Sequence, residues 1–307
     1  MIPNMKKTTW TRLILMLAAL FCVFGTTVFA KERCTTPQNA VSQNTSHGAM
    51  GWYFKKNDDH TLPPLDENLS YITQYGGYYA DTEARDDDRV IYLTFDAGYE
   101  NGNVEKILNV LKKHDAQGAF FVLSHLIEAE PDLVRRMVSE GHLVCNHSAN
   151  HRDMTTLSEG AFCEELSSLA ALFKETTGRD MAMYYRPPEG KFSETSLSYA
   201  QNAGYKTIFW SLAYPDWDND RQPDPEKAKE TLLSHTHNGM VLLLHPTSAT
   251  NAAILDDLLT SWETDGYRFG SLDELTAKAT AAKATAAKTT AASDSVRTVG
   301  EKEVTGT

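Results

Sequence analysis

The stretch "IYLTFDAGYENG", residues 91–102, is an apolar run that ends in a carboxylate, Asp96, and continues with Ala97. A short apolar run followed by glycine-containing sequence is typical of a buried β-strand. The carboxylate therefore stands at the end of a buried strand, and alanine occupies the next position, where a second polar group could lie.

Short apolar runs like this one recur from Arg89 onward and alternate with longer segments of helical period. Helix-starting and helix-stopping residues separate them, with Pro131 and Ser158 at two starts and Gly141, Gly178, Gly204 and Gly266 at the ends. The alternation favours an α/β fold, a mainly parallel sheet with crossover helices. The seven runs are "RVIYLTF" (89–95), "GAFFVL" (118–123), "HLVCN" (142–146), "MYYR" (183–186), "YKTIFWS" (205–211), "GMVLLLH" (239–245) and "YRFGSL" (267–272).

Residues 1–30 have the pattern of a secretory signal peptide. "MKKTTWTR" is basic, "LILMLAALFCVFGTTV" is apolar, and "VFA" offers small residues at the cleavage position. An apolar stretch of this length could instead be retained as a membrane anchor. In either case we expect the rest of the chain to work outside the cytoplasm, secreted or associated with the cell wall.

The charge of the chain argues against nucleic acid as a partner. The formal net charge is −12, and removal of Lys6, Lys7 and Arg12 with the signal takes it to −15. Binding a phosphate backbone requires Lys and Arg. A protein this acidic is therefore a poor candidate for binding nucleic acid.

The cysteines give no clear disulfide pattern. Cys34, Cys145 and Cys163 remain after the signal, an odd number without C-x-x-C spacing. Cys145 lies in an apolar run and Cys163 in a helical pattern. We expect both to be small buried apolar side chains rather than metal ligands or bridge partners.

Composition divides the mature chain into three parts. Residues 31–87 are polar and interrupted by Gly and Pro, so we expect an irregular, partly ordered extension whose aromatic residues pack on another part of the protein. Residues 88–275 hold the strand–helix alternation. Residues 276–307 begin with Ala, Thr and evenly spaced Lys, without an apolar stripe, which indicates a disordered or frayed helical tail, or else a weak basic tether to anionic wall polymer.

Polar residues gather where the apolar runs end. Asp96 ends the first run, "NHSANH" (146–151) follows the third, Arg186 ends the fourth, "DW" (216–217) follows the fifth, and His245 ends the sixth. The carboxyl ends of parallel strands meet at one edge of a sheet or barrel. We therefore expect these side chains to converge on one site.

Within this set, His147 and His151 are four residues apart, a spacing that lets two imidazoles bind one metal ion on a helical turn. The same spacing also occurs by chance on solvated surfaces. Asp96 could be a simple helix cap or turn residue. Beside two metal ligands it would instead be the natural general base for a water molecule.

The remaining polar residues have comparable alternatives. Arg186, between aromatics and two prolines, could keep Asp96 ionised, or it could lie in a surface turn. Trp217 could form an apolar surface against a sugar or acetyl group, or it could be a core residue. His245, with Asp216 beside it, could give a proton to a leaving amine, whereas a lone histidine after an apolar strand is more often a core residue.

Taken in order, these motifs resemble the polysaccharide deacetylase family, the NodB-homology group of carbohydrate esterases. The resemblance covers about residues 88–275 and is closest to the branch that makes muramic δ-lactam in the spore cortex. It implies a distorted (β/α) barrel of seven strands, in agreement with the seven apolar runs. The motifs are "TFDAGY" (94–99), "HSANH" (147–151), "RPPEG" (186–190), "DW" (216–217) and "LLLH" (242–245).

The resemblance also implies roles for individual residues. Asp96 is then the general base, Arg186 orients it, and His245 is the general acid assisted by Asp216. His147 and His151 bind a divalent cation (Zn, Mg, Mn or Co). The substrate-binding residues implied are Trp217, Glu189 and Tyr99.

Ala97 departs from the family pattern, in which members with the strongest metal sites have a second aspartate directly after the base. Alanine offers no donor atom, so the cation would keep two imidazoles and rely otherwise on water or substrate oxygen. Fewer anionic ligands bind a cation less tightly. We therefore expect a loosely held, exchangeable metal.

The sequence thus predicts an exported, metal-assisted amidase that removes acetyl groups from peptidoglycan glycan strands, most directly from N-acetylmuramic acid. Two alternatives stay open: a deacetylase of chitin oligomers or another acetylated glycan, and a wall-binding protein with a decayed site, which Ala97 would suggest. Lactam ring closure, signal cleavage and oligomeric state are not legible from the sequence.

Overall fold

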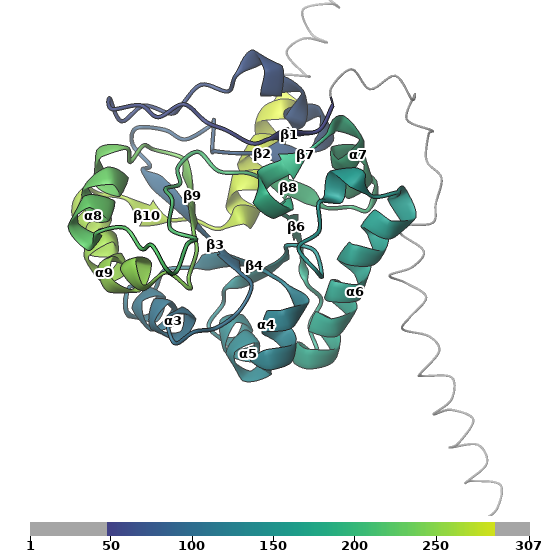
Figure 1. Ribbon diagram of the computed structural model, residues 1–307. Helices are drawn as coiled ribbons and strands as arrows, with labels where there is room; N and C mark the ends of the chain where they lie inside the picture. The colour runs from purple at the N-terminus through teal and green to yellow at the C-terminus, as the bar shows by residue number, and fades with distance from the viewer. Residues whose placement is uncertain (1–47, 286–307) are drawn as a thin grey trace, which may run out of the picture.

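The computed structural model describes residues 48–285 and shows a curled, mainly parallel sheet wrapped by helices (Figure 1). Each of the seven apolar runs forms a strand, which confirms that prediction. The sheet has β-branched and aromatic residues along its length, as fits strands buried on both faces. The strands are β3 (Val90–Ala97), β4 (Gly118–Val122), β5 (Leu143–Asn146), β6 (Ala182–Tyr185), β8 (Lys206–Ile208), β9 (Met240–Leu244) and β10 (Arg268–Phe269).

The sheet is curled, as expected for a distorted barrel, and its strand order shows how the strands follow one another around it. Strands β10, β3, β4, β5, β6 and β8 follow one another side by side, and β9 pairs with β3 on the side away from β4. A parallel bridge from Leu212 to Leu242 connects the chain after β8 to β9. The seven strands thus form a curled half-barrel, with this bridge across its gap.

Alternation along β3 separates two apolar layers. Ile91, Leu93 and Phe95 belong to the large cluster that includes the helices, whereas Val90 and Tyr92 belong to the cluster inside the barrel. Because successive side chains point to opposite faces of a strand, Asp96 follows the inner set. Ala97 is fully buried in the outer cluster.

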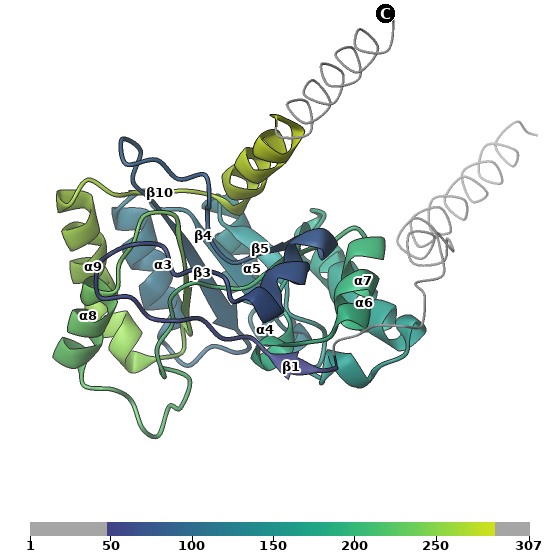
Figure 2. The same cartoon turned by 90° about the horizontal axis from the view of Figure 1, so that it is seen from above.

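The helices cover the outside of this sheet, with α8 and α9 on one side and α6 and α7 on the other (Figure 2). Their ends are those that the sequence indicates: Ser158 caps α6 through its hydroxyl, and Gly178 closes it at a φ of 70°, where a side chain would be strained. The helices are α3 (Val104–Lys113), α4 (Ser124–Ala129), α5 (Pro131–Ser139), α6 (Glu159–Thr177), α7 (Glu194–Asn202), α8 (Pro225–Ser234) and α9 (Ala249–Thr264), with short 3-10 turns η2 (Met154–Thr156) and η3 (Pro188–Gly190).

The described part of the N-terminal extension packs on the barrel, as its aromatic residues indicate. Trp52 stacks on Phe209 with ring centroids 4.3 Å apart and donates to the carbonyl of Trp210. The extension also contributes regular structure that its broken sequence did not predict, because two-residue strands carry no periodic signal. These elements are β1 (Met50–Gly51), which pairs with β7 (Lys191–Phe192), η1 (Glu67–Tyr75), and β2 (Gly77–Tyr78), which extends the main sheet beside β8.

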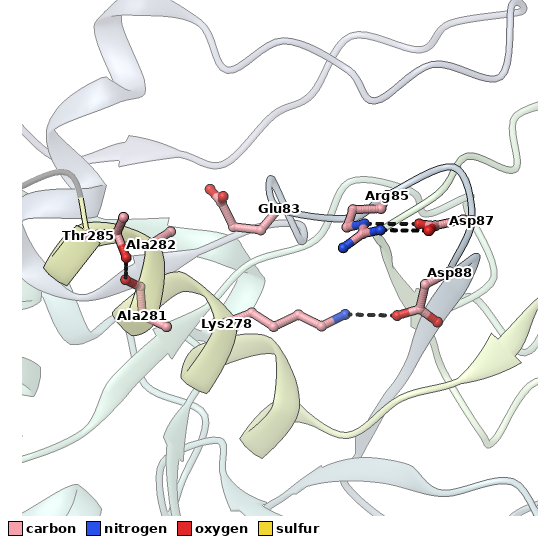
Figure 3. Close-up of a pocket in the computed structure, with 8 residues that line it drawn as sticks. All are labelled: Glu83, Arg85, Asp87, Asp88, Lys278, Ala281, Ala282 and Thr285. Carbon is pink, nitrogen blue, oxygen red and sulfur yellow. Dashed lines mark hydrogen bonds and ion pairs between the residues drawn. The ribbon is translucent and has the colours of Figure 1, made fainter. Parts of the chain in front are cut away.

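The predicted tail starts as an ordered helix, since residues 272–285 are helical and residues 286–307 lie outside the described part. Ionic contacts rather than an apolar stripe hold the start of the predicted tail: Lys278 contacts Asp81 at 3.2 Å and Asp88 at 3.5 Å. Figure 3 shows the surface cavity of about 580 Å³ beside Lys278. It lies at the amino end of β3, away from Asp96.

Cys163 is buried as expected, but the expectation that it forms no bridge was wrong. Cys163 is disulfide-bonded, and its partner lies outside the described residues, because the other described cysteine, Cys145, is free and buried. The sequence did not predict this disulfide, because Cys163 lies in a helical pattern and the number of cysteines after the signal is odd. No helix within residues 48–285 is long and apolar enough to cross a membrane, and the segment 1–30 lies outside that range.

Candidate active site

Strand register places the predicted residues at one edge of the barrel. Phe95 pairs with Leu244, so Asp96 and His245 are the next residues on two adjacent parallel strands. Asn146 pairs with Val122 on one side and Tyr185 on the other, which brings His147 and Arg186 to the same edge. The convergence expected from the strand ends is therefore present.

Asp96 and Arg186 form a buried ion pair. Arg186 Nη1 donates to Asp96 Oδ1 at 2.7 Å, and the Arg186 side chain has no exposed surface. Burial by itself would raise the pKa of the Asp96 carboxyl, but the charges of Arg186, His147 and His245 outweigh it and hold that pKa below its usual value. Arg186 is the permanent cation of the three, so it keeps Asp96 ionised.

Arg186 is itself fixed by further contacts. Its Nε donates to the carbonyl of Ile208 at 3.0 Å, its Nη2 donates to Thr94 Oγ1 at 2.8 Å, and its guanidinium lies 4.2 Å from the Phe121 ring centroid. Such contacts offset the cost of burying a charge and fix the direction in which it points. Arg186 is therefore a rigid support for Asp96 and not part of a surface turn.

His147 is oriented by the main chain at the end of β6, the neighbouring strand in the sheet. Its Nδ1 lies 2.8 Å from the carbonyl oxygen of Arg186. A carbonyl can only accept, so Nδ1 carries the hydrogen and Nε2 keeps its lone pair. That Nε2 lies 3.6 Å from Asp96 Oδ2. Burial lowers the pKa of His147 to about 4, against the attraction of Asp96, so the ring is neutral near neutral pH.

His151 completes the pair through an unusual loop rather than a helical turn. Ser148 and His151 have φ values of 67° and 54°, a conformation that costs non-glycine residues energy. Ser148 compensates by accepting from the backbone N–H of His151 at 3.0 Å. The result is that the His147 and His151 ring centroids lie 5.1 Å apart.

The residues at this edge fit a divalent cation as a donor set. His147 Nε2 offers a lone pair and the His151 ring lies beside it, which provides two imidazoles, ligands that suit transition metals. Within residues 48–285, however, no three His, Cys, Asp or Glu side chains form a ready-made metal cluster. Ala97 adds nothing to this set, being packed in the outer apolar layer.

His245 and Asp216 form the second charged pair. Asp216 Oδ1 accepts from His245 Nδ1, and Asp216 Oδ2 accepts from the His245 backbone N–H, each at 2.7 Å. Burial lowers the pKa of His245, but the hydrogen bond and the charge of Asp216, with a contribution from Asp96, outweigh it and raise that pKa above its usual value. Nδ1 is occupied, so Nε2 is the ring atom that can exchange a proton.

Two of the proposed substrate-binding residues form an exposed rim around this pair. Trp217 is 62% exposed, with its ring centroid 6.4 Å from that of His245, and Tyr99 is 42% exposed. Asn219, on the Trp217 loop, donates to the Tyr99 hydroxyl. Trp217 therefore is not a core residue, and both aromatic side chains have surface available to a ligand.

Glu189 occupies a different position. Its side chain is exposed and pairs with Lys191 at 2.6 Å, and its backbone has a φ of 56° in η3 directly after Arg186. The Glu189 carboxylate is therefore engaged with lysine, and its backbone lies three residues after Arg186 in the sequence.

Sequence reasoning missed the residues that support the pairs. Thr94 accepts from Arg186 and donates to the carbonyl of Leu242 at 2.6 Å. Asn251 donates to Asp216 Oδ2 at 2.6 Å from the first turn of α9. Thr94 lies two residues before Asp96 on one face of a strand, a spacing that could have revealed it. Asn251 lies in a helical segment without any distinguishing pattern.

Comparison with known proteins agrees with this geometry. Residues 83–208 match the family model described as polysaccharide deacetylase. The chain is 40% identical to the peptidoglycan-N-acetylmuramic acid deacetylase PdaA of Bacillus subtilis, over 77% of this chain and 89% of the relative. Family 4 carbohydrate esterases, to which the solved homologues belong, are generally metal-dependent.

Solved structures extend the comparison to the fold. The structure of Bacillus subtilis PdaA, described as a family 4 carbohydrate esterase, superposes with a TM-score of 0.71 at 39% identity, covering 74% of this chain and 96% of that one. A family 4 pseudoenzyme from Bacillus anthracis matches with a TM-score of 0.59 at 25% identity, covering 65% and 68%. The chain belongs to the polysaccharide deacetylase family, carbohydrate esterase family 4, and is a deacetylase, a hydrolase acting on amide bonds.

Proposed function

We propose that this protein removes the N-acetyl group of N-acetylmuramic acid in peptidoglycan, in the route to the muramic δ-lactam of spore cortex, and that it acts outside the cytoplasm. The substrate assignment is supported by the identity to a relative named for that activity. The observation that carries the reaction is the placement of a carboxylate ionised by Arg186 beside an imidazole held by Asp216, on adjacent strands.

In this proposal Asp96 is the general base. Its Oδ1 is engaged by Arg186, so Oδ2 accepts a proton from water as the water oxygen attacks the acetyl carbonyl carbon. The carbonyl oxygen becomes negative, and a backbone N–H near Glu189 stabilises it. When bound by His147 and His151, a loosely held divalent cation supplies Lewis-acid polarisation of the carbonyl.

His245 is the general acid in the second half of the reaction. Its Nε2 gives a proton to the sugar nitrogen as the carbon–nitrogen bond breaks, which leaves acetate and a free amine. Asp216 stabilises the charged ring and fixes which nitrogen carries the transferable proton. Trp217 and Tyr99 would contact the sugar with their exposed faces.

The test is acetate release from peptidoglycan, chitin oligomers and acetyl-xylan, each with and without added Zn²⁺, Mg²⁺, Mn²⁺ or Co²⁺, followed by mass spectrometry of the products. We expect acetate from peptidoglycan, with the lost acetyl group on the muramic sugar. Acetate from chitin oligomers alone would refute the muramic assignment. Such a result would favour the alternative that the protein deacetylates chitin oligomers. A relative from Rhizobium leguminosarum bv. trifolii named chitooligosaccharide deacetylase, 34% identical over 53% of this chain and 74% of the relative, supports that alternative.

A second candidate is a wall-binding protein with a decayed site. Ala97 favours it, since it leaves the metal with fewer anionic ligands, and a similar fold is described as a pseudoenzyme. This candidate requires glycan binding without acetate release under any metal. The intact Asp96–Arg186 and Asp216–His245 pairs argue against it.

A further inference from the structure

Asn251 is a buried polar residue directly behind the acid pair. It is 1% exposed and lies in the first turn of α9. Its side-chain nitrogen donates to Asp216 Oδ2 at 2.6 Å and to the carbonyl of His245 at 3.0 Å. Its side-chain oxygen accepts from the hydroxyl of Tyr214, which is also buried.

These partners fix which way the amide faces. The Asp216 carboxylate and the His245 carbonyl are both acceptors, so the NH₂ group must face them, and the oxygen must face the Tyr214 hydroxyl. A buried amide whose hydrogen bonds are satisfied on both sides is rigid, and leaving any of these groups unpaired costs energy.

We propose that Asn251, held by Tyr214, is a positioning residue for acid catalysis: it fixes the Asp216 carboxylate and the His245 main chain in the arrangement that aims the imidazole at the leaving amine. The inference rests on the proposed function of His245 as general acid. Asn251 acts only through Asp216 and His245 and need not contact the substrate.

The geometry explains how the effect arises. Asp216 Oδ2 accepts from Asn251 and from the His245 backbone N–H, while Oδ1 accepts from the imidazole. Without Asn251, Oδ2 keeps one donor and the carboxylate can rotate, so the imidazole loses its fixed direction. The His245 carbonyl also loses its side-chain donor. A displacement of about 1 Å in a reacting group can lower a rate by about 100-fold.

Three variants test the proposal on the full-length protein, assayed by acetate release: Asn251→Ala, the isosteric Asn251→Asp, and Tyr214→Phe. Each is made alone and combined with Asp216→Asn. Asn238, which donates to the carbonyl of Arg85 and accepts from Val90 N–H near the amino end of β3, gives the matched control Asn238→Ala. Thermal unfolding establishes that each variant is folded.

We expect Asn251→Ala to lower kcat by up to about 100-fold with KM changed less than about twofold. Asn251→Asp should lose as much, because it replaces the donor with an acceptor at constant size. Tyr214→Phe should lose less. In the Asp216→Asn background all three changes should have little further effect, since residues that act through one another are not additive.

The outcomes separate this inference from the proposed function. If the wild-type protein releases no acetate, the proposed function fails. If it is active and Asn251→Asp or Tyr214→Phe retains full kcat, or if losses add independently of Asp216→Asn, Asn251 merely fills space and the inference fails. An Asn238→Ala protein with the same loss of kcat as Asn251→Ala would equally overturn it.

Discussion

Replacing Asp216 with asparagine tests whether this carboxylate orients His245 and raises the pKa of its imidazole. Three donors converge on this carboxylate: the His245 imidazole and backbone N–H at 2.7 Å each, and Asn251 at 2.6 Å. An asparagine has one acceptor oxygen and one NH₂ group, so either amide orientation sets its NH₂ against a donor. The substitution therefore preserves size while it removes the charge and leaves a buried donor unpaired.

The structure gives the scale of the effect. At an effective dielectric constant of about 20, two unit charges about 4 Å apart attract by about 4 kcal/mol, part of which is lost as desolvation. An unpaired buried donor costs a further ~1–3 kcal/mol of stability. Positioned acid–base groups contribute roughly 10²- to 10⁴-fold to a rate. We expect kcat for acetate release to fall within that range.

The pH dependence has a definite sign. Asp216 raises the pKa of His245, so the protonated acid persists to higher pH, and Asp216→Asn should move the alkaline limb of kcat/KM to lower pH. The same coupling stabilises the fold at pH values below the ordinary histidine pKa, and this stability is lost as pH rises through the raised one.

The assay is acetate release across pH 5 to 10 (roughly the range that brackets histidine titration). Asp218→Asn is the matched control, because Asp218 lies two residues away and pairs with Arg221 instead. An Asp216→Asn protein with an unchanged alkaline limb and unchanged kcat would refute the assignment of His245 as the acid.

Four other changes have distinct signatures. Arg186→Leu leaves Asp96 buried without its cation, so the free energy of unfolding should fall by about 3–5 kcal/mol in urea titrations, and the acid limb of activity should move to higher pH; equal stability would contradict the ion-pair reasoning. Trp217→Ala should raise KM for glycan and leave the thermal midpoint unchanged, because the side chain is 62% exposed; an unaltered KM would remove Trp217 from the binding rim. Lys278→Met should lower stability by roughly 1–3 kcal/mol at unchanged kcat, because the Asp81 side chain, 1% exposed, loses its cation; lost activity in folded protein would contradict the separation of this helix from the site. His147→Ala should abolish any rise of the thermal midpoint on adding Zn²⁺, whereas a persistent rise would place the metal elsewhere.

The sequence predicted the parts of the fold that carry strong local patterns. The seven apolar runs became the seven strands because most of their residues are buried, and the polar residues after them converged because parallel strands share an edge. Asp96, His147, Arg186, Asp216 and His245 were predictable for this reason. The loop around His151 differs in detail, since positive φ values at Ser148 and His151 replace the helical turn.

The parts that depend on distant contacts left no local signal. Asn251 functions through a hydrogen bond to a residue 35 positions earlier, and Lys278 through one 197 positions earlier. The disulfide of Cys163 likewise depends on a partner outside its own helix. In each case the residue type fits many local structures, and only the tertiary arrangement decides what it does.

If the protein is a working hydrolase of the proposed kind, Asp96 is the base that takes the proton from water. The decisive measurement is acetate release from peptidoglycan by wild-type and Asp96→Asn protein at equal folded concentration, in the presence of the metal that best supports the wild type. We predict that the wild type releases acetate and that Asp96→Asn is slower by roughly 10²-fold or more. Equal release by the two proteins would contradict the proposed chemistry.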